Sequence, residues 1–168
     1  MTVVPAYERK PRSISFTDRA LARYYRVAFA WPAVAGPAGV RLRLGDVVDA
    51  LAVRAPLAAE VDHTLVQSLL GAPVVELRDP GVCWIFLTQP RIPLRPSTWD
   101  DLTRAGIEWS EPGTSLPLPA LRGGGNGLRW RKCPVHGTKL PPWTAVVGAI
   151  RSAVSRSSAC PLRKAAAT

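Results

Sequence analysis

A turn between two β-rich runs is the clearest structural signal in the chain, and it lies in residues 73–88, PVVELRDPGVCWIFLT. Proline presets φ at the first corner of a turn and glycine tolerates a positive φ, so Asp79-Pro80-Gly81 predicts a tight connection. The flanking runs are rich in Val, Ile, Trp and Phe, which are common in strands. We therefore expect a β-hairpin, and a hairpin argues against a purely parallel sheet.

Helix and strand patterns are interspersed on both sides of this hairpin. Apolar residues recur at helical spacing in several segments, whereas residues 39–44 alternate apolar and basic side chains as a half-buried strand does. The expected helices cover residues 17–31, 56–70, 97–105 and 143–155. The other expected strands cover residues 39–44, 47–53, 107–109, 116–119 and 128–132. This order predicts an α+β fold with a single mixed β-sheet and flanking helices.

The length of 168 residues is enough for one good core. We expect a basic arm over residues 1–15, a single α+β domain over residues 16–157 and a frayed basic tail over residues 158–168. No stretch approaches the roughly 20 apolar residues that cross a bilayer, and three cysteines make no disulfide framework. These features predict a cytoplasmic protein without a membrane partner.

Positive charge is gathered at the two ends of the chain. The net charge is +10. Residues 1–30 hold six basic against two acidic residues, residues 31–111 hold seven against ten, and residues 112–168 hold nine basic residues and no acid. A cationic surface attracts polyanions because association releases condensed counterions. The alternative is a solvated basic surface with no partner.

The acid-free end contains the best candidates for nucleic-acid binding. A glycine-rich run at residues 123–127 leads into Arg129-Trp130-Arg131-Lys132. The run lacks the Lys-Ser/Thr pair of a phosphate-binding loop and precedes a strand, so it is expected to be a turn. On a strand, Trp130 would face the core while Arg129 and Arg131 face outward. The predicted nucleic-acid contacts are Arg122, Arg129, Arg131 and Lys132.

Two carboxylates could in principle serve metal-dependent catalysis. Asp46 and Asp49 follow a strand, but two-metal sites on strands need a spacing of two for both side chains to share a face. The spacing of three favours a loop carboxylate and a surface carboxylate instead. Mg²⁺ or Mn²⁺ is expected only if the protein is an active enzyme, and otherwise no cofactor is expected.

A Cys-x-x-His turn is the sharpest local spacing in the chain. Cys133 and His136 could supply half of a tetrahedral zinc site. The other half is missing, because Cys160 and His63 have no neighbouring ligand and Cys83 lies in a strand pattern. A turn with an exposed thiol is therefore the preferred interpretation, and no triad can be assembled around His63.

Several soft motifs between residues 39 and 151 resemble actinobacterial proteins related to the N-terminal domain of bifunctional DNA primase/polymerases. The motifs are GDVVD at 45–49, GAPV at 71–74, WIFL at 84–87, GTSLPLP at 113–119, GLRW at 127–130 and LPPW at 140–143. The resemblance implies a fold similar to the archaeo-eukaryotic primase core, which binds nucleic acid and nucleotide on its sheet. Active members use a strand carboxylate pair, a histidine and a further aspartate with divalent metal. Only Asp46 and Asp49 lie near the first of these, so the resemblance implies a catalytically degenerate copy.

Three functions follow from these observations. The first is a non-catalytic nucleic-acid-binding domain of primase/polymerase-like fold that uses the basic C-terminal surface. The second is a protein-interaction or regulatory module whose apolar face contains Trp31, Trp109 or Trp143. The third is an active metal-dependent DNA primase/polymerase, which requires Asp46 and Asp49 to converge.

Overall fold

The computed structural model describes residues 15–78, 80–120 and 127–158. The helices are α1 (Phe16–Phe29), α2 (Leu57–Gln67), α3 (Pro96–Arg104) and α4 (Trp143–Ser158). The strands are β1 (Ala33–Gly36), β2 (Gly39–Arg43), β3 (Asp49–Arg54), β4 (Val74–Leu77), β5 (Cys83–Thr88), β6 (Glu108–Trp109), β7 (Ser115–Pro117) and β8 (Leu128–Lys132). The predicted arm at 1–15 and tail at 158–168 fall almost wholly outside the described residues, as does Arg122.

These strands form two sheets, so the prediction of a single mixed sheet is wrong. One sheet has three strands in the order β1-β2-β7, and the other has five in the order β6-β3-β5-β4-β8. Every described strand pair is antiparallel. The predicted hairpin is confirmed as β4 and β5, with Val74 opposite Phe86 and Leu77 opposite Cys83. The α+β class is also confirmed.

The larger sheet contains a recognisable chain order. From β3 to β6 the elements follow as β3-α2-β4-β5-α3-β6, and β5 lies between β3 and β4 in the sheet. This is the split β-α-β arrangement, in which two strands joined by a helix are separated by a third. Strand β8 extends the sheet beyond β4, and β6 forms the opposite edge.

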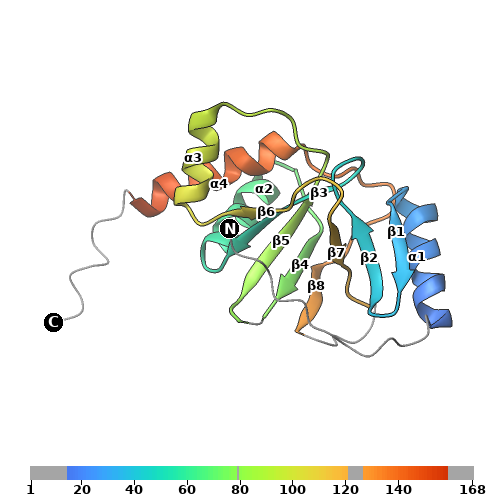
Figure 1. Ribbon diagram of the computed structural model, residues 1–168. Helices are drawn as coiled ribbons and strands as arrows, with labels where there is room; N and C mark the ends of the chain where they lie inside the picture. The colour runs from blue at the N-terminus through green and yellow to red at the C-terminus, as the bar shows by residue number, and fades with distance from the viewer. Residues whose placement is uncertain (1–14, 79, 121–126, 159–168) are drawn as a thin grey trace.

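Two hydrophobic cores lie on the two faces of the five-stranded sheet. Helices α2, α3 and α4 cover one face, as Figure 1 shows, and the core beneath them includes Leu65, Phe86 and Trp143. The three-stranded sheet and α1 cover the other face, where the core includes Tyr25 and Leu42. The five-stranded sheet is therefore the middle layer. Only its ends and edges can present side chains to a partner.

Helix α1 begins and ends where local chemistry satisfies its backbone. The helix expected over residues 17–31 begins at Phe16, and its N-cap is Ser15, whose Oγ accepts a hydrogen bond from Asp18 N at 3.0 Å. The helix ends at Phe29, and Ala30 adopts a left-handed conformation with φ 54°. None of the helices in the described part of the chain is long and apolar enough to cross a membrane.

Strand β8 contains a β-bulge. Lys132 lies opposite Val74 and Trp130 lies opposite Val75, so Arg131 is an extra residue between two successive pairs. A bulge interrupts the regular alternation of side chains between the two faces of a sheet. Because of it, Arg131 and Lys132 both contact groups on the α2 side of the sheet, although they are consecutive in sequence.

Candidate nucleic-acid interface

Three arginines converge on one buried carboxylate at the β4–β8 end of the sheet. The carboxylate is Glu76 in β4, which is 2% exposed. Arg129 lies opposite it on β8, Arg131 is the bulge residue of the same strand, and Arg78 follows β4. We call Arg78, Arg129 and Arg131 the arginine cluster. Their side chains are 55%, 48% and 41% exposed, so the cations face solvent while the carboxylate lies behind them.

Both oxygens of Glu76 accept hydrogen bonds from the cluster. Arg129 donates from Nε to Oε1 at 3.0 Å and from Nη2 to Oε2 at 3.1 Å, which is a forked, bidentate pair. Arg78 Nε donates to Oε1 at 2.6 Å and Arg131 Nη1 donates to Oε2 at 3.3 Å. Hydrogen bonds from Arg129 and then Arg78 lower the pKa of Glu76 from 4.5 to about 2, against the opposing effect of burial. The arginine cluster and Glu76 together carry three positive charges and one negative charge.

The guanidinium of Arg131 is also held by an aromatic ring. Its Cζ lies 3.7 Å from the ring centroid of Trp84, the residue opposite Glu76 on β5. An arginine over an indole is stabilised electrostatically and keeps its plane fixed. The indole Nε1 of Trp84 is buried and has no hydrogen-bond partner among the described residues. The guanidinium of Arg131 is therefore fixed in position next to an indole N–H that has no hydrogen-bond partner among the described residues.

The remaining basic residue of the strand is compensated separately. Lys132 Nζ lies 2.6 Å from Oδ1 of Asp62 in α2. Trp130 faces the second core, as expected, and its Nε1 donates to Tyr25 Oη at 3.1 Å. The cations of β8 thus lie on one side of the strand and its tryptophan on the other. Arg129 and Arg131 are exposed, as the strand pattern predicts, but the pattern does not reveal Glu76 as their partner or Asp62 as the partner of Lys132.

Asp49 is buried and paired, contrary to the expectation of a surface carboxylate. It is 0% exposed at the start of β3. Its Oδ2 accepts from Arg91 Nε at 2.7 Å, and its Oδ1 accepts from Arg91 Nη2 at 3.2 Å and from Ala50 N at 2.9 Å. Arg91 also donates to the Ser110 carbonyl oxygen. The ion pair joins the start of β3 to the segment after β5, and Arg91 also reaches the segment after β6. A metal ion at Asp49 would have to displace Arg91.

The other predicted carboxylate, Asp46, has a different environment. It is exposed in the turn between β2 and β3, as expected for a loop carboxylate. The turn is closed by a hydrogen bond from Gly45 N to the Val48 carbonyl oxygen at 2.8 Å. Gly45 has φ +114°, and an added Cβ there would lie 2.9 Å from Pro112 Cβ. The close approach of Pro112 therefore requires a glycine at position 45. Asp46 is exposed, whereas Asp49 is buried.

The Cys-x-x-His segment forms an exposed turn after β8. Cys133 and His136 are both exposed, and the His136 ring lies 6.4 Å from the ring of Phe29. Within the described ranges, no three His, Cys, Asp or Glu side chains are grouped so that they could hold a metal ion. Cys160, a residue considered as a partner ligand, lies outside those ranges.

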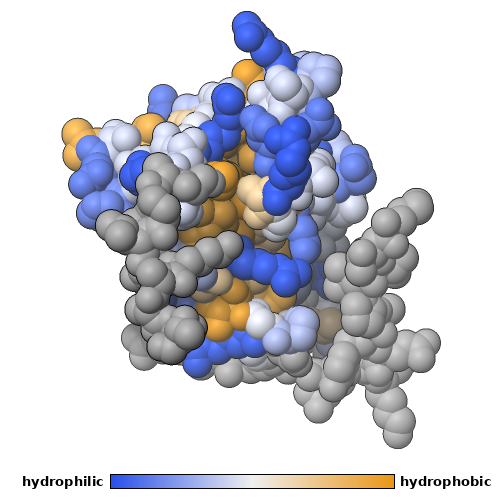
Figure 2. All heavy atoms as spheres, turned by 90° about the vertical axis from the view of Figure 1, so that its left-hand side faces the viewer, coloured by the Kyte–Doolittle hydropathy of each residue, from blue (hydrophilic) through white to orange (hydrophobic). Residues whose placement is uncertain are grey.

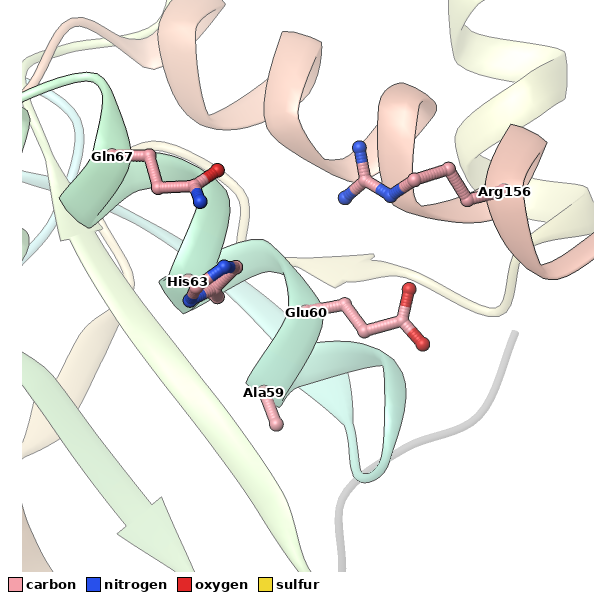
Figure 3. A pocket seen from close by; sticks show the side chains of 5 residues that line it. All are labelled: Ala59, Glu60, His63, Gln67 and Arg156. Carbon is pink, nitrogen blue, oxygen red and sulfur yellow. The ribbon is translucent and has the colours of Figure 1, made fainter.

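A shallow pocket lies between α2 and α4. Figure 3 shows its lining, which is Ala59, Glu60, His63, Gln67 and Arg156. Arg156 comes from α4, and its Nη2 donates to Thr64 Oγ1 at 2.8 Å. His63 is exposed, as expected.

The surface on the side seen at the left of Figure 1 is mixed in character. Figure 2 shows there a band of hydrophobic residues that hydrophilic side chains border and cross. The lining of the pocket between α2 and α4 contains one cation, Arg156. The arginine cluster is therefore the better candidate for a polyanion contact.

Comparisons of the chain with models of protein families, with curated proteins and with solved structures gave no match.

Proposed function

We propose that this protein is a non-catalytic, nucleic-acid-binding domain of primase/polymerase-like fold that contacts phosphates through the arginine cluster. The observation that carries the proposal is the convergence of three half-exposed arginines on a single carboxylate. This leaves two net positive charges at one end of the sheet. Guanidinium groups present planar, forked donors that match phosphate oxygens, so such a cluster suits a phosphodiester backbone.

The fold part of the proposal is supported by the split β-α-β order of the larger sheet and by the soft motifs described above. The motif LPPW at 140–143 contributes Trp143, which is buried in the core under α4. The motif WIFL at 84–87 forms most of β5, the central strand of the sheet. The marks of the resemblance are thus residues that build the framework. They support a shared framework more directly than a shared reaction.

A protein-interaction module is the second candidate, and the outer face of α1 favours it. Phe16 and Val27 are 87% and 77% exposed, and they lie 11 residues apart on one side of the helix. Arg23 is exposed on the same side of the helix, between these two apolar residues, and Arg19 is exposed beside it. Trp31 and Trp143, in contrast, are buried and offer no docking surface.

An active metal-dependent nucleotidyltransferase is the third candidate. It requires Asp49 to exchange its pairing with Arg91 for a metal ion. It also requires Asp46 to reach the same site from its exposed turn. No observation in the described residues favours that arrangement over the ion pair.

The proposal is tested by a salt-titrated binding assay with nuclease-treated protein and a fluorescent oligonucleotide. Arg78→Gln removes one cation of the cluster, whereas Arg104→Gln removes one exposed cation that pairs with Asp101 on α3. We expect wild type to bind at low salt, with a steep loss of affinity as salt rises. Arg78→Gln should weaken binding several-fold and reduce the salt slope by about 1, while Arg104→Gln should leave both unchanged. Absence of wild-type binding at low salt, or equal effects of the two substitutions, overturns the proposal.

A further inference from the structure

We infer that Glu76 limits the affinity of the arginine cluster for phosphate, because it is a built-in anion that competes with the ligand. This inference rests on the proposed nucleic-acid binding and concerns the same site. It assigns Glu76 the role of an affinity-determining residue that touches the binding cations. It predicts that removing the negative charge of Glu76 strengthens the binding of phosphate to the arginine cluster.

The first step of the argument is the position of the carboxylate. The side chain of Glu76 is 3% exposed, while the three arginines above it are 41–55% exposed. A phosphate arriving from solvent therefore meets guanidinium groups first and has the carboxylate directly behind them. The two anions would share the same three cations at short range. Their mutual repulsion is weakly screened because one of them is buried.

The second step is the use of the donors. Arg129 gives its forked edge, Nε and Nη2, to the two oxygens of Glu76. This edge has the geometry that binds carboxylate or phosphate bidentately. Glu76 also takes the Nε donor of Arg78. A phosphate must therefore accept hydrogen bonds from the outer N–H groups that remain. Otherwise it must displace the carboxylate of Glu76 from the donors that this carboxylate already occupies.

The third step is that one cation of the cluster keeps its position without a charged Glu76. Arg131 is held over the ring of Trp84, and Arg129 lies in a paired strand opposite position 76. A glutamine at position 76 has the same shape and retains one oxygen as an acceptor. Glu76→Gln thus changes the net charge of the group from +2 to +3 and leaves the contact between Arg131 and Trp84 in place.

The test compares Glu76→Gln with Glu108→Gln in the oligonucleotide-binding assay. Glu108 pairs with Arg54 and lies in β6, whereas β8 is the opposite edge of the sheet. Glu76 lies in β4, three strand spacings or about 14 Å from β6, which exceeds the screening length of about 8 Å at physiological salt. Both substitutions change the net charge equally. At physiological salt we expect Glu76→Gln to bind about 3–10-fold more tightly than wild type, with a salt slope steeper by about 1, and Glu108→Gln to match wild type.

The outcomes separate this inference from the function on which it rests. If wild type binds but folded Glu76→Gln binds no more tightly than Glu108→Gln, the competition is refuted and the binding proposal stands. If neither wild type nor Glu76→Gln binds at low salt, the binding proposal itself fails. Should Glu76→Gln fail to fold, the double variant Glu76→Gln/Arg78→Gln keeps the wild-type net charge. Competition requires it to bind more tightly than Arg78→Gln alone, and equal or weaker binding refutes it.

Discussion

Replacement of Glu76 by glutamine should weaken the fold in a pH-dependent way. The lowering of its pKa from 4.5 to about 2 corresponds to about 3 kcal/mol of stabilisation by the ionised carboxylate at neutral pH. Water around the half-exposed arginines screens these ion pairs, which reduces the expected contribution to about 1–2 kcal/mol. A carboxyl group whose pKa is lower in the folded state stabilises the fold fully above pH 4.5. That stabilisation is lost as the pH falls through about 2.

The assay is urea unfolding of wild type, Glu76→Gln and the control Glu108→Gln at pH 7 and at pH 3. We expect Glu76→Gln to lower the free energy of unfolding by about 1–2 kcal/mol at pH 7, and by less than half as much at pH 3. Glu108, in an exposed pair with Arg54, should contribute less than about 1 kcal/mol. A difference between wild type and Glu76→Gln that is the same at both pH values would refute this electrostatic account. The same substitution is thus expected to reduce stability and to increase polyanion affinity.

Three further substitutions test other contacts. Arg91→Ala leaves the buried Asp49 carboxylate uncompensated and should lower the free energy of unfolding by about 3 kcal/mol in urea, and a loss below about 1 kcal/mol would show that the pair is not structural. Leu69→Gly should raise stability by about 0.5–1 kcal/mol in thermal unfolding, because Leu69 has φ 58° and is 92% exposed; a lower melting temperature contradicts this. Tyr25→Phe removes the acceptor of the Trp130 indole N–H and should cost about 1 kcal/mol, which unchanged urea unfolding would disprove.

Local patterns in the sequence predicted most of the individual elements. The hairpin, the helices at α2, α3 and α4 and the strand at β8 all depend on nearby residues, such as the turn glycine and the apolar spacing. Strand β1 was not expected, because Ala33–Gly36 lies in an apolar, proline-containing run without alternation. The division into two sheets was missed because it depends on distant pairing. Arg41 of β2, for example, pairs with Pro117 of β7.

The candidate site was predictable in part for the same reason. The basic character and outward direction of Arg129 and Arg131 follow from the strand pattern, and the structure agrees with both. Their shared partner Glu76 is 53 and 55 residues away, so no local spacing reveals it. One signal was available, since Glu76 is a lone acid in an otherwise apolar strand. A buried acid in a strand requires compensating partners.

The bulge in β8 decides how the basic residues of that strand act together. In a regular strand, Arg129 and Arg131 would lie on one face and Lys132 on the other, beside Trp130. The extra residue instead turns all three cations toward Glu76 and Asp62. The charge density of this end of the protein is therefore a property of backbone register as well as of composition. Without the bulge, the same residues would carry the same net charge, but Lys132 would lie on the opposite face of the sheet from Arg129 and Arg131.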